Sequence, residues 1–375
     1  MLQGSIVQDP ADIETLVPRW DALAVDLDRP YGLPSWLLAW QRHVAPPGSH
    51  TLIVAVNDDE DLLGLFPLTS YPGPGGLLVH RFLASDTSMP VAPLVRPERR
   101  EETLRAAGET LGSARPEITT LSLRGAEASS DWSELLADAF HGRQPRVYVE
   151  DKMPAPVIRI QGREYADLLQ SRSSKFRQQM RRSRRRAEEQ GAVFRRARDV
   201  DAAKDDLRTF ARLHLDRWKD RGGSLALRPG VFEMLLDFAE QEIPTGRFRI
   251  FSIDLDETTI STQLFVRAGR RTSFWLGAFD PAAPVRNPGL LAILAGIEDA
   301  FGEGVDEIDL GPGDDQYKRS LTDDDVVLRW ETIVAGGKGS LGRRARLLPY
   351  QARRAVARRL PEGVRIKVKK LLRRG

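Results

Sequence analysis

The stretch RTSFWLGAFDPAAPVRNPGLLAILAGIEDAFGEGVDEIDLGPGDDQYK, residues 271–318, is the part of the sequence that decides the fold. Residues 272–279 are aromatic and apolar, as expected of a buried strand, and the proline-rich segment after them has no apolar periodicity. From Leu290 the apolar side chains recur on one helical face, and glycines end that helix before residues 307–310. The stretch therefore predicts a strand, a loop, a helix, a short strand and a final loop.

The start of the predicted helix suits an anionic ligand. A helix that begins near Gly289, after a loop carrying Arg286 and Asn287, has free backbone N–H groups in its first turn. These groups, the helix dipole and the nearby arginine together favour a phosphate or a pyrophosphate. The alternative is an ordinary strand–loop–helix connection with a surface arginine, because most such connections bind nothing.

Composition limits the classes of protein that remain. With 375 residues and 41% hydrophobic content, the chain can bury a large core, and we expect two domains. The absence of cysteine excludes disulfides, a thiol nucleophile and thiolate metal sites, and the five scattered histidines predict no metal site. No apolar run approaches the roughly 20 residues of a spanning helix, and no signal segment begins the chain. We therefore expect a cytoplasmic protein, at most peripheral to the inner face of the membrane.

The positive charge is concentrated at the C-terminus. Residues 338–375 contain fourteen Lys or Arg and one Glu, a net charge of +13, so the rest of the chain carries −10 of the total of +3. Apolar residues recur there at helical spacing, between Leu348 and Leu360 and again between Val364 and Leu372. A basic amphipathic segment of this kind binds an anionic membrane surface or another polyanion. The alternative is a helix packed on the acidic body of the protein.

The first 150 residues alternate strands and helices. Helical patterns at residues 9–24 and around Trp36 precede a predicted hairpin at residues 52–68, and further strands and helices follow to residue 140. This order predicts an α/β half-domain. Asp86 lies in a polar break between two apolar runs, which fits either a turn or an acceptor pocket. The polar, proline-containing residues 144–156 predict the boundary between the two halves.

A basic helix is predicted next, over residues 165–191. It carries eight Lys or Arg side chains and only a thin apolar stripe. Such a charge run is either a solvated face or a surface that attracts an anionic donor or acceptor. We do not expect nucleic acid as a partner, because no aromatic residues interleave the arginines and no RNA-binding motif is present.

A second helix, residues 200–219, places His214 on its apolar face. This histidine is either a core residue bonded to backbone or a site residue that binds acceptor or carries a proton. A third helix follows at residues 229–241, and then three strands between residues 248 and 279 form a predicted antiparallel meander.

Four motifs, taken in order, resemble the GNAT acyltransferase superfamily, in particular its CelD-like branch. Arg286-x-x-Gly289 resembles a weakened pyrophosphate loop (Gln/Arg-x-x-Gly-x-Gly/Ala), with Leu291 at the last position. The run from Asp309 to Lys318 resembles the closing motif of that branch. Further matches are Ser85-Asp-Thr87 and the segment LHxxRWxxRG, residues 213–222. The resemblance extends from about the N-terminus to residue 335. The CelD-like branch is associated with cellulose and other polysaccharide biosynthesis and is related to the FemAB peptidoglycan transferases.

The resemblance implies a fold and an activity. The fold is α/β (α+β), with tandem GNAT-like domains whose mixed, largely antiparallel sheets are flanked by helices. Residues 1–150 form the N-terminal half, residues 151–335 the acyltransferase half and residues 336–375 the basic amphipathic tail. The activity is acyl-CoA-dependent N- or O-acyl transfer, with acetyl-CoA as the first choice of donor, to a sugar, glycolipid or polysaccharide-precursor acceptor in cell-envelope synthesis. The alternatives are a FemAB-like aminoacyl transferase using charged tRNA, and a degenerate accessory protein of a membrane biosynthetic complex.

Residue roles follow from the same resemblance. In a GNAT fold the strand before the pyrophosphate loop splays from its neighbour, which frees backbone amides for the pantetheine arm and one amide, here near Gly277, for the oxyanion. The expected donor-binding residues are Phe274, Leu276, Gly277, Ala278, Arg286, Asn287, Gly289 and Leu290. The expected catalytic residues, which would move protons, are Asp309, Tyr317, Lys318 and His214. The expected acceptor-binding residues are Asp86, Arg217 and Trp218.

Overall fold

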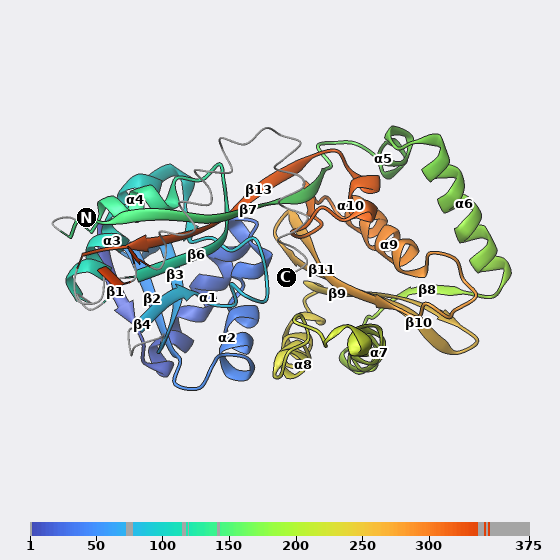
Figure 1. Cartoon of the computed structure of the whole chain (residues 1–375), viewed down its shortest axis with the longest axis horizontal. Helices are drawn as coiled ribbons and strands as arrows, with labels where there is room; N and C mark the ends of the chain where they lie inside the picture. The colour runs from blue at the N-terminus through green and yellow to red at the C-terminus, as the bar shows by residue number, and fades with distance from the viewer. Residues whose placement is uncertain are drawn as a thin grey trace.

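A computed structural model describes residues 2–72, 78–114, 118, 120–140, 143–336, 341–342 and 344–345. Nearly all of the predicted basic tail, residues 336–375, therefore lies outside the described residues. Figure 1 shows the two halves of the chain side by side, with two long strands running between them.

The N-terminal half alternates strands and helices, as predicted. Its elements are β1 (Leu2–Val7), α1 (Pro10–Asp26), α2 (Pro34–His43), β2 (His50–Asp58), β3 (Asp61–Pro72), β4 (Leu78–Phe82), β5 (Leu94–Val95), α3 (Arg100–Ala114), β6 (Thr120–Glu127) and α4 (Trp132–Asp138). Helix α1 begins at a proline, and the Asp9 side chain caps it by accepting from the Ala11 N–H at 2.9 Å. Strand β1 was not predicted, because its short polar sequence carries no apolar alternation.

The C-terminal half confirms the predicted meander and the loop, helix and strand after it. Its elements are β7 (Arg146–Arg159), α5 (Tyr165–Ser171), α6 (Ser174–Glu189), β8 (Val193–Arg196), α7 (Val200–Trp218), α8 (Val231–Glu242), β9 (Phe248–Leu255), β10 (Thr258–Ala268), β11 (Arg271–Phe279), α9 (Pro288–Gly302), β12 (Glu307–Asp309), α10 (Gln316–Leu321) and β13 (Asp325–Val334).

Two details of this half differ from the prediction. The basic segment is two helices, because Ser173 caps a new helix by accepting from the Phe176 N–H at 3.2 Å. The final loop expected to carry Tyr317 and Lys318 is the short helix α10.

Within the described residues the strands form one 13-stranded sheet. The order is β1-β2-β3-β4-β6-β13-β7-β12-β11-β10-β9-β8, with β5 paired to β3. Strand pairs are antiparallel except β4–β6 and β11–β12. Helices α7 and α8 lie on one side of the C-terminal strands, and α9 lies on the other (Figure 1). The prediction of mixed, largely antiparallel sheets flanked by helices is confirmed.

The two halves share strands, and one of these strands contains most of the predicted boundary. Residues 144–156 were expected to be a polar boundary segment, but most of them belong to the 14-residue strand β7. Strand β7 pairs with β13 over most of its length and with β12 at its end, and β13 also pairs with β6. The last strand of the chain therefore lies within the N-terminal part of the sheet (Figure 1). A polar composition did not exclude a strand here, because half of its residues face outward.

The halves also share a hydrophobic core. One cluster of buried residues combines α1 and α2 with α7, α8 and β9–β11. At its centre the ring of Trp36 lies 4.9 Å from that of Phe238 and 5.8 Å from that of Trp275. Buried aromatic contacts of this kind stabilise the arrangement of the two halves beyond the strand pairing.

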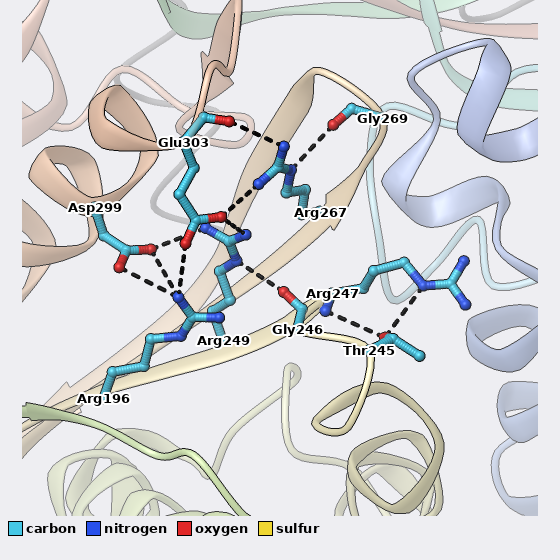
Figure 2. Close-up of polar contacts among 9 residues, drawn as sticks. All are labelled: Arg196, Thr245, Gly246, Arg247, Arg249, Arg267, Gly269, Asp299 and Glu303. Atoms are coloured by element: carbon cyan, nitrogen blue, oxygen red, sulfur yellow. Dashed lines mark hydrogen bonds and ion pairs between the residues drawn. The ribbon is translucent and has the colours of Figure 1, made fainter.

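A charged network fixes the C-terminal end of α9 (Figure 2). Arg249 donates to Asp299 at 2.8 Å and also contacts Glu303, while Arg196 donates to both carboxylates at 3.1–3.2 Å. Arg267 donates to Glu303 at 2.6 Å. Two carboxylates at a helix C-terminus oppose the helix dipole, so the three arginines from β8, β9 and β10 offset that cost. The same contacts hold α9 on the sheet, and the other end of α9 forms the cleft described next.

Candidate active site

Strand β11 is paired on both sides for only part of its length. It pairs with β10 up to Phe279, but its pairing with β12 ends where Ser273 meets Asp309. Residues 274–279 therefore have a strand partner on one side only. The predicted splay of this strand is present, and the open backbone faces a cleft of about 450 Å³.

The cleft brings together ten of the predicted site residues. They are His214, Arg217, Trp218, Phe274, Leu276, Gly277, Asn287, Gly289, Leu290 and Tyr317. Gln263, Phe279, Ile293 and Asp315 complete the lining. Residues from α7, β10, β11, α9 and α10 thus converge on a single cavity of the size that small-molecule sites have.

Two glycines set the walls of the cleft. A Cβ at Gly277 would lie 1.6 Å from Oε1 of Gln263, and a Cβ at Gly289 would lie 2.8 Å from Cδ1 of Phe279. Contacts this short would push both neighbours aside. Glycine therefore permits the close approach of these walls, and any larger residue would change the shape of the cleft.

The first turn of α9 forms the mouth of the cleft. Asn287 adopts a left-handed conformation (φ 58°), and its amide donates to Oγ of Ser183 in α6 at 3.3 Å. Pro288 has no N–H, and the Leu291 N–H bonds to the Asn287 carbonyl at 3.0 Å. The N–H groups of Gly289 and Leu290 remain as the donors of this turn that have no helical partner.

His214 is buried against Ser224, and their side chains lie 2.7 Å apart. The serine oxygen already accepts from the backbone N–H groups of Ala226 and Leu227, at 3.1 and 3.0 Å. Its hydroxyl proton is therefore free to be donated to Nε2 of the imidazole. Burial, with a smaller contribution from Arg217, lowers the pKa of His214 to about 4. The histidine is neutral near pH 7, as a proton acceptor must be.

Tyr317 reaches the cleft, whereas Asp309 and Lys318 lie behind it. Burial raises the pKa of Tyr317 well above its ordinary value, so the phenol stays protonated. Nζ of buried Lys318 donates to the carbonyls of Gly311 and Pro312, at 3.1 and 2.7 Å, and Asp309 is fully buried and accepts from the Gly311 N–H at 2.8 Å. Burial lowers the pKa of Lys318 and raises that of Asp309. Both side chains hold the turn at residues 310–313.

Two other predicted residues, Arg286 and Ala278, also lie off the cleft. Arg286 is exposed and is not part of the lining, although it is one residue from the mouth. Ala278 is buried, and its carbonyl accepts from Nε2 of Gln263 at 3.3 Å. Leu291, which occupies the last position of the loop motif, packs in the core beneath α9.

A second, smaller pocket of about 140 Å³ lies between the two halves. Its lining is Tyr31, Asp86, Thr87, Ser88, Met89, Ala226, Phe274, Trp275, Leu276, Gly311 and Pro312. Phe274 and Leu276 line both this interface pocket and the cleft, so the two cavities meet at β11. The arrangement allows one substrate to enter from each side of the strand.

Asp86 lies in the interface pocket between two arginines. Arg81 contacts one carboxylate oxygen at 3.0 Å, and Arg228 contacts the other at 2.8 Å. Arg228 also donates to the hydroxyl of Thr87 at 2.8 Å. Asp86 is thus oriented by one cation from each half of the protein.

The sequence analysis missed several residues of the two cavities. Gln263 is a buried amide in the middle of β10, next to the buried Ser261 and Thr262. Trp275 enters the interface pocket because a β-bulge leaves it without a partner in β10. Tyr31 and Arg228 carry no such signal, since their partners are far away in sequence.

Comparisons with known proteins agree with this geometry. Residues 174–319 match the family model described as "Acetyltransferase (GNAT) domain". The matched residues lie within the C-terminal half of the chain. No curated protein matches the chain. Among the residues that the structure describes, no helix is long and apolar enough to cross a membrane, and no cluster of three or more His, Asp or Glu could hold a metal ion.

Solved structures resemble the whole fold. FemX superposes with a TM-score of 0.63 at 13% identity, covering 88% of this chain and 96% of that chain. The C-terminal domain of a putative lysylphosphatidylglycerol synthetase from Agrobacterium fabrum gives 0.55 at 11% identity, with coverages of 88% and 95%. L-PGS from Bacillus licheniformis gives 0.52 at 13% identity, with coverages of 91% and 96%. At these identities the likeness shows the fold alone.

Proposed function

We propose that this protein is an aminoacyl transferase, which takes its acyl group from a charged tRNA and transfers it to an amine or hydroxyl of an acceptor in the interface pocket. The observation that carries the proposal is the basic helix α6 beside the mouth of the cleft. Its seven cations are Lys175, Arg177, Arg181, Arg182, Arg184, Arg185 and Arg186, against Glu188 and Glu189. The resemblance to FemAB transferases and the fold shared with FemX support the same donor.

The position of α6 next to the cleft supports a tRNA donor more strongly than its basic composition does. Asn287 lines the cleft and bonds to Ser183 of α6, so a donor that leaves the cleft by this mouth meets the arginine helix. Three of these arginines are exposed and have no ion-pair partner among the described residues: Arg181, Arg182 and Arg186. Uncompensated cations repel one another, and a phosphate backbone relieves that repulsion and releases counterions when it binds.

The cleft itself is poorly suited to the diphosphate of coenzyme A. Among the described residues, Arg217 is the one cation in its lining, and its guanidinium lies 5.0 Å from the ring centroid of Phe279. Asp315 adds a negative charge, and Pro288 supplies no N–H to a phosphate at the start of α9. An aminoacyl ester needs no diphosphate site in the cleft, because the phosphates of its tRNA fall outside.

The chemistry needs alignment and two proton transfers. The acceptor nitrogen or oxygen attacks the ester carbonyl, and a backbone N–H near Gly277 stabilises the oxygen of the tetrahedral intermediate. The Ser224 hydroxyl, which donates to Nε2 of neutral His214, takes the proton of the acceptor as it passes its own proton to the imidazole. When the carbon–oxygen bond to the ribose breaks, Tyr317 protonates the departing oxygen. Asp309 and Lys318 act as positioning residues, because they fix the turn that presents Gly311 and Pro312 to the acceptor.

The interface pocket defines the acceptor side. The carboxylate of Asp86 offers a hydrogen-bond acceptor to an amine or a hydroxyl, and Trp275 provides an apolar wall. A sugar or polysaccharide precursor remains our proposal for the acceptor, and a lipid-borne one fits both the predicted basic tail and the fold shared with a putative lysylphosphatidylglycerol synthetase.

A second candidate is acyl-CoA-dependent acetyl transfer. It is favoured by the match of residues 174–319 to an acetyltransferase model and by the free N–H groups of Gly289 and Leu290. In that case the pantetheine arm would lie along the open edge of β11, and the phosphates would rest on the first turn of α9.

Direct binding separates the two candidates. Full-length protein is titrated, by fluorescence anisotropy, with labelled tRNA charged from a mixed amino-acid pool and separately with a fluorescent coenzyme A analogue. We expect tRNA to bind with an affinity that falls steeply as salt rises, and acetyl-CoA not to compete. Binding of the coenzyme analogue with no binding of tRNA would overturn the proposal in favour of acetyl transfer.

Charge variants locate the tRNA surface. Arg181→Glu, Arg182→Glu and Arg186→Glu together should weaken tRNA binding by at least about 100-fold at low salt, because three phosphate contacts become repulsive. The matched control changes three exposed arginines remote from α6, at Arg105, Arg124 and Arg208, to Glu. An equal loss in both triple variants would mean that net charge, and not the α6 surface, governs binding.

A further inference from the structure

We propose that the cavity between α5, α6 and α9 binds an unstacked base from the single-stranded 3′ end of the donor tRNA. The inference rests on the proposed function and deepens it, because it names where the carrier of the acyl group is held. The cavity measures about 340 Å³ and is separate from both the cleft and the interface pocket.

The lining of this cavity has the chemistry of a base-binding site. Its apolar part comes from Ala166, Leu169, Met180, Leu291 and Leu294, with the ring of Tyr165 beside them. Three arginines and one acid complete it: Arg177, Arg181, Arg184 and Glu298. Proteins that hold single-stranded RNA place bases against aromatic rings and guanidinium planes and leave the phosphates on cations.

The three arginines differ in how they are held. Arg177 donates to the carbonyls of Gln170 and Arg172, at 2.6 and 3.0 Å, and Arg184 donates to Glu188 and Glu298, both at 3.1 Å. Arg181 is exposed and has no such partner within the described part of the chain. The cavity therefore combines two immobilised guanidinium planes with one arginine that is available to a phosphate.

Tyr165, the first residue of α5, supplies an aromatic surface beside the arginines of α6. Its ring packs edge-on against Phe301, with centroids 5.8 Å apart and an interplanar angle of 61°. This contact fixes the ring while leaving the side chain half-buried at the cavity. The fold places this ring, from the preceding helix α5, against the arginines of α6 that line the cavity.

The cavity lies on the face of α9 next to the one that lines the cleft, about 100° around the helix. Leu290 and Ile293 line the cleft, whereas Leu291 and Leu294 line the cavity. At the start of α9 the two sides are joined by the Asn287–Ser183 hydrogen bond, and Met180 of the cavity is one helical turn from Ser183. A nucleotide strand whose terminal ribose carries the acyl group in the cleft can pass this corner and place a preceding base in the cavity.

Two RNA probes test the inference. One is a minihelix with an unpaired 3′ CCA end, and the other is the same duplex with a blunt end, each titrated into full-length protein. We expect the CCA probe to bind about 5- to 150-fold more tightly, the range that stacking of one base provides. Tyr165→Ala should abolish this difference, and Tyr165→Phe, which keeps the ring, should preserve it. Urea unfolding of each variant checks that the fold is retained.

A double arginine variant outside the cavity separates base stacking from the general electrostatic attraction of RNA. Arg182→Ala with Arg186→Ala, outside the cavity lining, should weaken both probes by the same factor. Equal binding of the two probes by the wild type, or a CCA preference that survives in Tyr165→Ala, would overturn the inference while tRNA binding stands. Failure of both probes to bind would instead count against the proposed function. Loss of coenzyme A binding in Tyr165→Ala, with RNA binding unchanged, would assign the cavity to the adenosine of the coenzyme and also overturn the inference.

Discussion

The indole N–H of Trp275 donates to the backbone carbonyl of Thr87 at 2.9 Å, which joins the two halves of the protein at the interface pocket. Trp275 reaches this carbonyl because it is the bulged residue of β11, and Thr87 is held from the other side by Arg228. Phe274 and Leu276, on either side of Trp275, line both cavities. A single irregular strand therefore contacts both the donor side and the acceptor side of the proposed reaction.

Trp275→Phe should lower the free energy of unfolding by about 1–3 kcal/mol, because it removes this hydrogen bond and part of a buried ring. Donor binding should be unchanged, since Trp275 lies on the acceptor side. Urea unfolding and tRNA anisotropy measure the two effects. A variant with wild-type stability would show that the bond between the halves contributes nothing.

Gly289→Ala should weaken donor binding by about 5- to 150-fold, the equivalent of 1–3 kcal/mol of overpacking, because the new methyl group displaces the ring of Phe279 into the cleft. Gly302→Ala is the control on the same helix. A Cβ there meets nothing within 4 Å, so we expect unchanged binding and equal or slightly higher stability. Donor titration of both variants makes the comparison. Wild-type affinity in Gly289→Ala would remove this wall of the cleft from the donor site.

His214 should make stability depend on pH in a defined direction. Burial lowers its pKa in the folded protein to about 4, below the ordinary value of 6.5, so the unfolded chain takes up the proton first as the pH falls. The stabilisation present above about pH 6.5 is lost towards pH 4, by on the order of 3 kcal/mol. His214→Asn should lack this loss. Urea unfolding of both proteins, at about pH 7 and about pH 4.5, gives the difference. Parallel pH profiles would contradict the prediction.

Asp309 should make the stability of the fold depend on pH in the direction opposite to that of His214. Burial raises its pKa above the ordinary value despite nearby Arg271, so its neutral form favours the folded state. Stability present below the unfolded pKa of 3.8 is lost as the pH rises through the higher folded value. Asp309→Asn avoids this loss and can still accept from the Gly311 N–H. The variant should therefore gain stability relative to wild type as the pH rises, measured by urea unfolding. A relative loss would mean that Arg271 and Lys318 keep the carboxylate ionised.

The sequence by itself determined the strands, loop and helix that form the cleft. The apolar runs of β9, β10 and β11, the loop after them and the apolar face of α9 follow each other within residues 248–302, so their local periodicities specify both the elements and their order. Once β11 and β12 are placed as neighbours, the three-residue length of β12 requires the splay that opens the cleft. Ten of the predicted site residues meet there for this reason.

Three features depended on the tertiary structure alone. They are the interface pocket, the burial of Asp309 and Lys318, and the pairing of β13 with strands of both halves. Asp86 and Arg228 are 142 residues apart, and β13 pairs with β6 across more than 200 residues. Similarly, Tyr165 lies beside the arginines of α6 only because both helices pack on α9. Periodicity reports whether a side chain faces the core, but it carries no information about which distant residue it meets there. That choice depends on how the whole sheet is ordered, and strand order is a property of the folded chain.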